Sequence, residues 1–529
     1  MKSLMKKVFA AAAAIATVFG LAATTVATAN AADNATLTVS TTDAKFAGKT
    51  VNAYKMFSAT VSGDGKAVSY TLTDEWKPFF KNSVGLTGVT DENVNDKAND
   101  YVSKLKDSTL VAFATKASNW AQTKTNNITA DATATVSKNA ATDGKYTATF
   151  TGLGYGYYVV AVPGATLANA KSQYATLVSV HSTKVDADIK GDLPTVDKKV
   201  QVDGTGKDAT DAKIGDTLTF TLTSTIPDMS AYDTYTFNFK DTLSKGLTFG
   251  QVKSVKVENV TLTEDTDYTV TTPTASNNNT LTVAMKDFKT KQQANAGKKI
   301  TVTYTATLNE NAVVGGAGNV NSAKIQYSNN PSTNGTGESE PSKVRVFTYG
   351  FTVDKYTGDQ YTDAATRLAG AEFTLAHKDG SAISFVQVSA GSATANAVYR
   401  VAKAGETGTT TITTPANGKV VFEGLKNGEY TLTETKAPAG YNKLASAIGV
   451  KVNGQNNGTD TTNATVTITY NNDNGNDYNQ TASNGVIPVQ NKSGAILPGT
   501  GGMGTIAFTV IGVLVIALGV AWTLKRKNA

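Results

Sequence analysis

Short β-patterned segments recur through residues 33–500, and they constrain the fold more than any other feature of the chain. In each segment, apolar residues alternate with Thr and other polar residues, and Gly, Asn, Asp and Ser separate one segment from the next. Alternation of this kind places one face of a strand in a core and the other in solvent. Many short strands at close spacing favour an all-β chain of tandem β-sandwiches over a parallel α/β sheet. Clear examples are 36–39, 218–222, 300–304 and 464–468.

The strand pattern is interrupted twice, and the interruptions divide the chain into three predicted domains. Residues 191–194 break the pattern after the first cluster of strands, and residues 329–341 are rich in Asn, Ser, Gly and Pro. Helical spacing of apolar residues is limited to about 95–123, which predicts a minor helical part in the first domain. The expected domains are 33–190, 191–346 and 347–494.

Side chains suited to catalysis or metal binding are scarce in this chain. It has no Cys and only two His, which excludes disulfides and thiolate chemistry and argues against a His-rich metal site or a His-based triad. Phosphate-binding loops, nucleophile elbows and zinc motifs do not occur in the sequence. We therefore expect a protein that is not an enzyme and has no cofactor and no bound metal.

The two ends of the chain account for its formal net charge of +6. Residues 1–32 combine a basic start, an apolar run and small residues, as a secretory signal peptide does. A membrane anchor is the alternative there, but the apolar run is short for one. Residues 506–524 form a second apolar run, which as a helix of about 28 Å would cross a bilayer. Because the chain between the two ends is neutral, no nucleic-acid partner is expected.

Three polar side chains of the second domain occupy the apolar faces of predicted strands. Alternate residues of a strand share a face, so Lys198, Asp241 and Asn321 should point toward the core (the Lys198 set). Burying a Lys and a carboxylate is costly unless the two are paired. The third domain repeats this order of residue types with Lys355, Glu434 and Asn491 (the Lys355 set).

Two interpretations of these sets are open at this point. One is a buried ion pair beside an Asn, or side chains at strand ends whose charged groups reach solvent. The other is chemical: an apolar pocket favours a neutral amine and a protonated acid. The amine would then attack the Asn side-chain amide while the acid polarises the carbonyl and moves protons. Ammonia would leave, and a Lys–Asn isopeptide bond would remain.

A pentapeptide, LPGTG, precedes the C-terminal apolar run and its basic end. Together, residues 495–529 resemble the cell-wall sorting signal of Gram-positive surface proteins. The resemblance implies recognition of Leu497 and Pro498 by a sortase, which cleaves between Thr500 and Gly501. The enzyme would then transfer the Thr500 carbonyl to an amine.

Further motifs resemble one family. Residues 430–441 are similar to the E-box of sortase-assembled pilins, and segments beginning at Ile214, Asp241 and Asn321 resemble the isopeptide-forming middle domain of that family. The first domain resembles it loosely. The chain is thus similar to the backbone, or shaft, pilins of Gram-positive bacteria. This implies tandem Ig-like, CnaB-like β-sandwich domains.

The same resemblance implies one intramolecular bond in each of the last two domains. These bonds are Lys198–Asn321, assisted by Asp241, and Lys355–Asn491, assisted by Glu434. We expect none in the first domain. Lys55 could face inward there, but the strand at 175–180 offers no Asn and residues 154–162 offer no acid.

A polymer also needs an exposed lysine that accepts the Thr500 carbonyl of the next subunit. In related shaft pilins this lysine lies just before a proline-containing junction, and Lys190 resembles it by position. The aromatic-proline context usual in that motif is missing, since Asp188 and Ile189 precede Lys190. Lys184 is the alternative, and an ordinary solvated lysine is a third interpretation.

The function that follows is the major structural subunit of a sortase-polymerised pilus. It would be secreted, anchored in the membrane as a precursor, then attached to the cell wall, and it would support adhesion. Expected partners are a sortase, identical subunits, tip and base pilins, peptidoglycan, and a host or matrix ligand. A monomeric wall-anchored adhesin that binds such a ligand is the alternative, whereas a wall-anchored hydrolase lacks a catalytic constellation.

Overall fold

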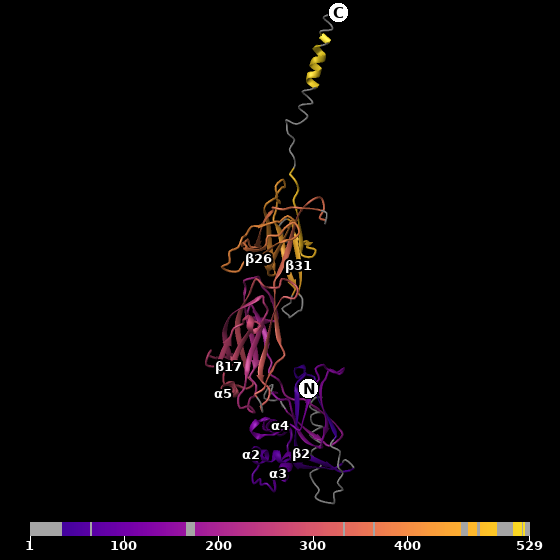
Figure 1. Ribbon diagram of the computed structural model, residues 1–529, viewed down its shortest axis with the longest axis vertical. Helices are drawn as coiled ribbons and strands as arrows, with labels where there is room; N and C mark the ends of the chain where they lie inside the picture. Colours follow the sequence, from indigo (N-terminus) through magenta and orange to yellow (C-terminus); the bar gives the residue numbers. More distant parts are fainter. Residues whose placement is uncertain are drawn as a thin grey trace. The chain divides into compact units, whose positions relative to one another are not determined.

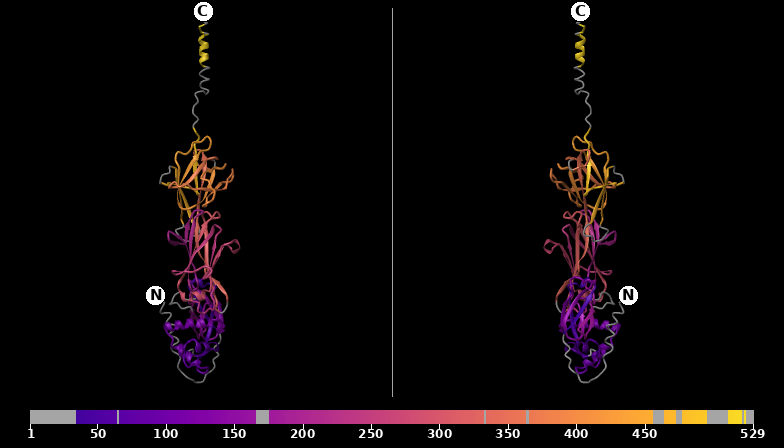
Figure 2. Two further views of the ribbon diagram at one scale, coloured as in Figure 1. Left: turned by 90° about the vertical axis from the view of Figure 1, so that its left-hand side faces the viewer. Right: turned by 90° about the vertical axis from the view of Figure 1, so that its right-hand side faces the viewer.

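The computed structural model describes residues 34–63, 66–165, 175–331, 334–362, 365–455, 464–472, 477–494, 511–520 and 522–523. The chain forms two compact units: unit 1 extends to Thr348 and includes Gly454–Thr465, and unit 2 comprises Tyr349–Asn453 and continues from Val466. Both are mostly β (Figure 1). Figure 2 shows that helix is concentrated in the indigo-to-purple part of the chain, apart from the yellow helix near the C-terminus.

The first part of unit 1 contains two sheets. Its strands are β1 (Ala35–Thr41), β2 (Thr50–Val61), β3 (Val68–Leu72), β4 (Ala132–Thr135), β5 (Tyr146–Leu153), β6 (Gly156–Ala161), β7 (Ala175–Val180) and β8 (Lys184–Asp188). In a three-stranded sheet, β1 pairs antiparallel with β5 and parallel with β8. The five-stranded sheet has the order β3-β2-β6-β7, with β4 also paired to β2. Core residues alternate along β1, as its sequence predicts.

Three helices lie together beside β2 in the same part of the chain (Figure 1). They are α2 (Lys77–Asn82), α3 (Val94–Ser103) and α4 (Asp107–Gln122). The buried residues of α3 and α4 recur at spacings of about four, which is the period that brings side chains onto one face of a helix. They pack with Trp76 and Phe79 in a shared core. The predicted helical part at 95–123 is confirmed by α3 and α4.

The second part of unit 1 forms two further sheets and the short helix α5 (Phe288–Gln292). Its strands are β9 (Asp197–Val202), β10 (Thr205–Lys207), β11 (Ala209–Asp211), β12 (Thr217–Thr225), β13 (Phe237–Leu243), β14 (Leu247–Val257), β15 (Val260–Thr261), β16 (Tyr268–Thr271), β17 (Thr280–Met285), β18 (Lys299–Leu308), β19 (Asn319–Ser328), β20 (Thr336–Glu338) and β21 (Ser342–Phe347). One six-stranded sheet has the order β10-β9-β12-β18-β14-β15. The seven-stranded sheet has the order β11-β21-β19-β13-β17-β16, with β20 paired to β19.

Unit 2 contains two six-stranded sheets. Its strands are β22 (Tyr349–Thr357), β23 (Thr366–Arg367), β24 (Glu372–His377), β25 (Phe385–Ser389), β26 (Ala397–Val401), β27 (Ile412–Thr413), β28 (Lys419–Leu425), β29 (Gly428–Lys436), β30 (Ile448–Gln455), β31 (Thr465–Asn471), β32 (Gln480–Thr481) and β33 (Val486–Gln490). The first sheet has the order β23-β22-β28-β26-β25, and β33 pairs parallel to β22. The second sheet has the order β27-β24-β29-β30-β31-β32.

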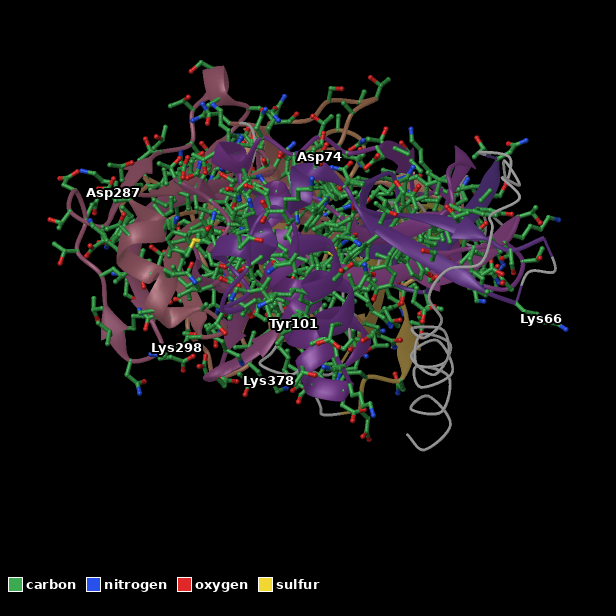
Figure 3. All side chains as sticks on the ribbon, turned by 90° about the horizontal axis from the view of Figure 1, so that it is seen from below. Lys66, Asp74, Tyr101, Asp287, Lys298 and Lys378 are labelled. Atoms are coloured by element: carbon green, nitrogen blue, oxygen red, sulfur yellow. The ribbon has the colours of Figure 1, made fainter. Side chains whose placement is uncertain are left out.

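Short 3₁₀ turns complete the described secondary structure. They are η1 (Ala44–Phe46), η2 (Asp74–Trp76), η3 (Lys124–Asn126), η4 (Ala275–Asn277) and η5 (Gln293–Asn295). Charged residues at turns, such as Asp287 and Lys298, lie at the periphery with exposed side chains (Figure 3). Within the described chain, the buried charged side chains are Lys198, Asp241, Asp354, Lys355 and Glu434.

The predicted terminal signals fall largely outside the described residues. Residues 1–32 and the pentapeptide with Leu497, Pro498, Thr500 and Gly501 are among those that the structure does not describe. Of the predicted span 506–524, residues 511–520 and 522–523 are helical. Across the described ranges, no helix has both the length and the apolar character that crossing a membrane requires.

Candidate functional site

The Lys198 set lies in the core of unit 1, and each of its three side chains is 0% exposed. Lys198 is on β9, where it lies opposite Leu222 of the neighbouring antiparallel strand β12. Asp241 on β13 and Asn321 on β19 belong to the other sheet, where β13 and β19 are neighbours. The lysine therefore reaches across the core to a carboxylate and an amide on the facing sheet.

Tyr304 on β18 joins the three groups of this set. Lys198 Nζ contacts Asp241 Oδ2 and donates to the Tyr304 hydroxyl at 2.8 Å. The Tyr304 hydroxyl donates to Asp241 Oδ2 and accepts a 2.6 Å hydrogen bond from Asn321 Nδ2. Asp241 Oδ1 and Asn321 Oδ1 have no hydrogen-bond partner among the described residues. One carboxylate oxygen of Asp241 and the amide oxygen of Asn321 therefore accept no hydrogen bond from the described residues.

Burial controls the charge of the amine in this site. It lowers the pKa of Lys198 to about 8, and this effect outweighs the opposing effect of Asp241. The rings of Phe220 and Tyr304 lie 5.1 Å from Lys198 Nζ and exclude water from it. Burial, followed by the adjacent Asp241, raises the pKa of Tyr304 well above its usual value. The phenol therefore keeps its proton at neutral pH.

The Lys355 set lies in the core of unit 2, where its side chains are at most 2% exposed. Lys355 is on β22, and Asn491 directly follows β33, whose Val489 pairs with Lys355. The backbone N–H of Asn491 donates to Tyr356 O at 3.0 Å and continues this pairing. Glu434 comes from β29 in the other sheet. Here the lysine and the asparagine lie on neighbouring strands of one sheet, and the carboxylate faces them.

Glu434 contacts both reacting side chains of the Lys355 set. Its Oε1 lies 3.4 Å from Lys355 Nζ, and its Oε2 accepts a 3.0 Å hydrogen bond from Asn491 Nδ2. Oε2 also accepts from the N–H of Leu444 at 2.8 Å, while Asn491 Nδ2 donates to Asn442 O at 2.8 Å. These bonds hold the loop after β29 against Asn491. Burial lowers the pKa of Lys355 to about 8, against the effect of Glu434.

Two known families match stretches of the chain that include Asp241 and Asn321 of the Lys198 set and Glu434 of the Lys355 set. The family described as "Gram-positive pilin backbone subunit 2, Cna-B-like domain" matches residues 214–331. The family described as "Prealbumin-like fold domain" matches residues 359–467. The first of these stretches is therefore similar to a domain of Gram-positive pilin backbone subunits. The first description names a pilus subunit, and the second names a fold.

Individual relatives are also similar to parts of the chain. The trypsin-resistant surface T6 protein of Streptococcus pyogenes serotype M6 is 25% identical over 279 residues, which are 48% of this chain and 44% of the relative. The chain therefore spans less than half of that relative. The structure of the T6 backbone pilin of S. pyogenes covers 80% of this chain and 83% of that chain, at 20% identity and a TM-score of 0.45. A C-terminal fragment of the major pilin GBS80 of Streptococcus agalactiae covers 57% of this chain and 100% of that chain, at 24% identity and a TM-score of 0.41.

The first part of unit 1 has no equivalent of the two sets around Lys55. Lys55 is half-buried on β2, and its Nζ lies 5.7 Å from the centre of the Tyr158 ring. Among the described residues, its side chain forms neither an ion pair nor a hydrogen bond. Its backbone N–H donates to Asp131 Oδ2 at 2.6 Å. The absence of an internal bond in this part of unit 1 stays a prediction.

The two candidate polymerising lysines lie near the start and the end of the same strand. Lys184 begins β8 and is exposed. Lys190 follows the end of β8, and its side chain is 31% exposed and lies 3.4 Å from Asp188 Oδ2. Gly191 follows with a φ of 104°, a backbone conformation that favours glycine. Lys190 is therefore on the connection from β8 to β9.

Asp354 is a buried carboxylate that the strand pattern did not single out. It is 0% exposed, and its oxygens lie 2.7 Å from Arg367 Nε and 3.7 Å from Lys419 Nζ. Tyr361 donates a hydrogen bond to it at 2.9 Å. Two cations and a phenol thus neutralise this carboxylate, which holds β23 and the preceding loop on β22.

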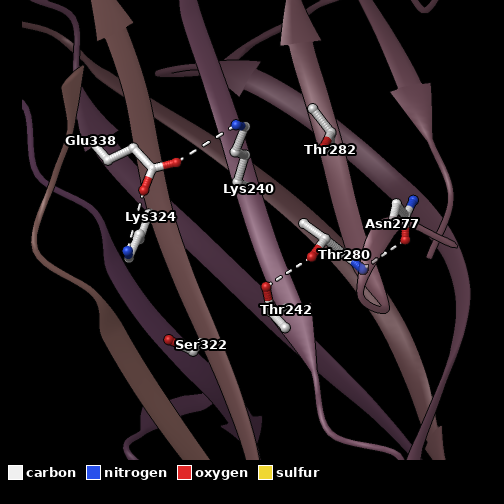
Figure 4. A pocket seen from close by; sticks show the side chains of 8 residues that line it. All are labelled: Lys240, Thr242, Asn277, Thr280, Thr282, Ser322, Lys324 and Glu338. Carbon is white, nitrogen blue, oxygen red and sulfur yellow. Dashed lines mark hydrogen bonds and ion pairs between the residues drawn. The ribbon is translucent and has the colours of Figure 1, made fainter. Parts of the chain in front are cut away.

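Two cavities adjoin these pilin sheets. One, of about 400 Å³, lies on the outer face of the sheet with β13 and β19, where Glu338 is 3.6 Å from Lys240 and 3.2 Å from Lys324 (Figure 4). The carboxylate between the two lysines offsets their charge, so the cavity is not a strong anion site. The other, of about 470 Å³, is in unit 2 and is lined in part by Leu444, Val489 and Asn491.

Proposed function

We propose that the chain is the major structural subunit of a sortase-polymerised pilus on a Gram-positive cell surface, built from Ig-like, Cna-B-like β-sandwich domains. The observation that carries the proposal is the pair of buried Lys–carboxylate–Asn sets in a chain without cysteine. Two internal isopeptide bonds would supply the covalent reinforcement that disulfides supply in other secreted proteins. Each bond would form once, within the chain that carries it, so this chemistry would not make the chain an enzyme. The chain would instead be a substrate of a sortase.

In the Lys355 set, the neutral amine is the nucleophile. A pKa of about 8 makes neutral Lys355 far more abundant near pH 7 than an ordinary lysine amine. A half-turn of the Asn491 amide exchanges its nitrogen and oxygen and directs the carbonyl to Glu434 Oε2. Protonated Glu434 can then donate to that carbonyl while Lys355 Nζ attacks Cγ.

The reaction balances without any further reactant. The bond between Lys355 Nζ and Asn491 Cγ forms, the Cγ–Nδ2 bond breaks, and Nδ2 leaves as ammonia with a proton from Nζ. The cavity of about 470 Å³ that reaches Asn491 offers ammonia a route to solvent. In the Lys198 set, Lys198 would attack Asn321 in the same way, with Asp241 in the role of Glu434.

Polymerisation would use separate residues. A sortase would cleave between Thr500 and Gly501 and join the Thr500 carbonyl to Lys190 of the next subunit, giving a head-to-tail chain. Lys190 is accessible, and its 3.4 Å ion pair with the exposed Asp188 is of a kind that contributes little. Lys184 is the alternative acceptor.

Targeting would depend on the two terminal signals. Residues 1–32 would direct secretion and be removed, and the 506–524 helix would hold the precursor in the membrane until a sortase acts. The product would be anchored to peptidoglycan and would carry tip and base pilins. Binding of a host or matrix ligand would be a property of the assembled pilus.

An immunoblot of cell-wall extracts under denaturing conditions tests this function. A ladder of multimers is the expected result, and a single band would leave the monomeric adhesin as the function. Lys190→Ala should reduce the ladder to monomer while both internal bonds still form, and Lys184→Ala is the matched control. Loss of the ladder in Lys184→Ala alone would transfer the linking role to Lys184.

A further inference from the structure

The Tyr304 hydroxyl bridges the two reacting nitrogens of the Lys198 set. Lys198 Nζ donates to it at 2.8 Å and Asn321 Nδ2 donates to it at 2.6 Å, while it donates to Asp241. We propose that Tyr304 is a catalytic residue for the Lys198–Asn321 bond and that its hydroxyl relays a proton from the amine to the leaving nitrogen. The inference rests on the proposed isopeptide chemistry and adds a fourth participant to it.

A comparison of the two sets explains why one of them needs a phenol. Glu434 reaches the lysine with one oxygen, at 3.4 Å, and the asparagine with the other, at 3.0 Å. Asp241 is one methylene shorter, and among the described residues it pairs with Lys198 but forms no hydrogen bond with Asn321. Tyr304 supplies the missing connection, because its hydroxyl contacts the asparagine and also the acid. Asp241 and Tyr304 together therefore connect the lysine to the asparagine, as Glu434 does alone in the Lys355 set.

Both proton transfers of the reaction pass through the Tyr304 hydroxyl. When Lys198 Nζ attacks Asn321 Cγ, the amide carbon becomes tetrahedral and Nδ2 regains a lone pair. The Tyr304 oxygen accepts the proton that Nζ loses, and Tyr304 gives its own proton to Nδ2. The Cγ–Nδ2 bond then breaks and ammonia leaves. Tyr304 ends as it began, so the relay consumes nothing.

The position of the hydroxyl is fixed by packing that does not involve hydrogen bonds. The Tyr304 ring is stacked on Phe220 with centroids 5.3 Å apart and an interplanar angle of 17°. Tyr304→Phe keeps this ring and removes only the oxygen. Tyr232→Phe is the control, because it removes another buried hydroxyl in the same part of unit 1, one that donates to Ser328 O at 3.2 Å and contacts none of the Lys198 set.

Intact mass over time, with peptide mapping, tests the relay on recombinant residues 33–500, the predicted mature chain. Wild type and Tyr232→Phe should lack two ammonia units of about 17 Da each in the first sample. Tyr304→Phe should lack one, and it should form the Lys198–Asn321 link at least about 100-fold more slowly. That residual reaction should speed up as the pH rises to about 8, since the amine must then lose its proton to solvent.

The outcomes separate the relay from the bond and from folding. Loss of both units from Tyr304→Phe in the first sample would overturn the relay. A wild-type chain with Lys198 and Asn321 unlinked would overturn the bond and the relay together. In the Asp241→Ala background, where no bond forms, Tyr304→Phe and Tyr232→Phe should lower the melting temperature alike. A much larger drop with Tyr304→Phe would assign it a structural role instead.

Discussion

Asp241→Ala should prevent the bond between Lys198 and Asn321 and leave the Lys355–Asn491 bond intact. Asp241 is the carboxylate in contact with Lys198 Nζ, and it also accepts the Tyr304 hydroxyl bond. Its removal takes away the acid that would polarise the Asn321 carbonyl. The two sets share no residue, so unit 2 should react as in the wild type.

The stability cost can be estimated from the loop that the bond encloses. The crosslink would close residues 198–321, and a covalent closure of about 100 residues restricts the unfolded chain by roughly 4–5 kcal/mol. For a domain of this size, each kcal/mol moves the melting temperature by about 2–4 °C. Asp241→Ala should therefore lower the melting temperature of this part of unit 1 by about 8–20 °C.

Mass spectrometry and calorimetry on the same samples measure both effects. The mass deficit of residues 33–500 should fall from two ammonia units of about 17 Da to one. Asp197→Ala is the control, since this carboxylate is on the same strand as Lys198 but is 64% exposed and pairs with Lys199 at 3.3 Å. It should keep both units and the wild-type melting temperature.

One result would refute this reasoning. If Asp241→Ala still lacks two ammonia units, the acid takes no part in the reaction and the set is a buried ion pair beside an amide. A full-length wild-type mass, with no ammonia lost, would lead to the same conclusion for both sets.

Three further outcomes are expected. Glu434→Ala should leave Lys355 and Asn491 unlinked, so that the chain lacks one ammonia unit. A deficit of two ammonia units would show that Glu434 takes no part in bond formation. In Asn321→Ala, where Lys198 stays free, the free energy of unfolding should rise by up to about 3 kcal/mol from pH 8 to 10.5, because the unfolded chain then binds the proton that the folded chain has released. Denaturant titration should show this rise, and it should be absent from Asn321→Ala with Lys198→Met. Asp354→Asn should destabilise unit 2 by about 3–5 kcal/mol with the mass deficit unchanged, since Arg367 loses the partner of a buried charge; an unaltered unfolding curve would contradict this.

Alternation along single strands was enough to predict that the polar side chains of the Lys198 set lie inside. Lys198, Asp241 and Asn321 each share a strand face with apolar neighbours, and each is buried. Tyr304 was not predicted, because a tyrosine on the apolar face of a strand is indistinguishable from an ordinary core aromatic until the partners of its hydroxyl are known. Asp354 was missed for a related reason. It alternates onto the opposite face from Lys355, and residues outside its own strand cover it.

The sheet to which each strand belongs was also beyond the reach of the sequence. Local alternation assigns a residue to a face, but strand pairing depends on contacts between segments far apart in the chain. The parallel pairing of β22 with β33 joins segments from the beginning and the end of unit 2. Nothing in either segment alone specifies that partner.

This difference in strand pairing would give the two proposed bonds different mechanical and dynamic roles. Lys198 and Asn321 come from facing sheets, so their bond would be a covalent crosslink between the two sheets. It would oppose separation of one sheet from the other. Lys355 and Asn491 lie on neighbouring strands, so their bond would crosslink two strands of the same sheet. The two sheets of unit 2 would be held together by noncovalent contacts alone and could separate transiently. Amide hydrogens in the core of unit 2 should therefore exchange through local opening more readily than those around Lys198.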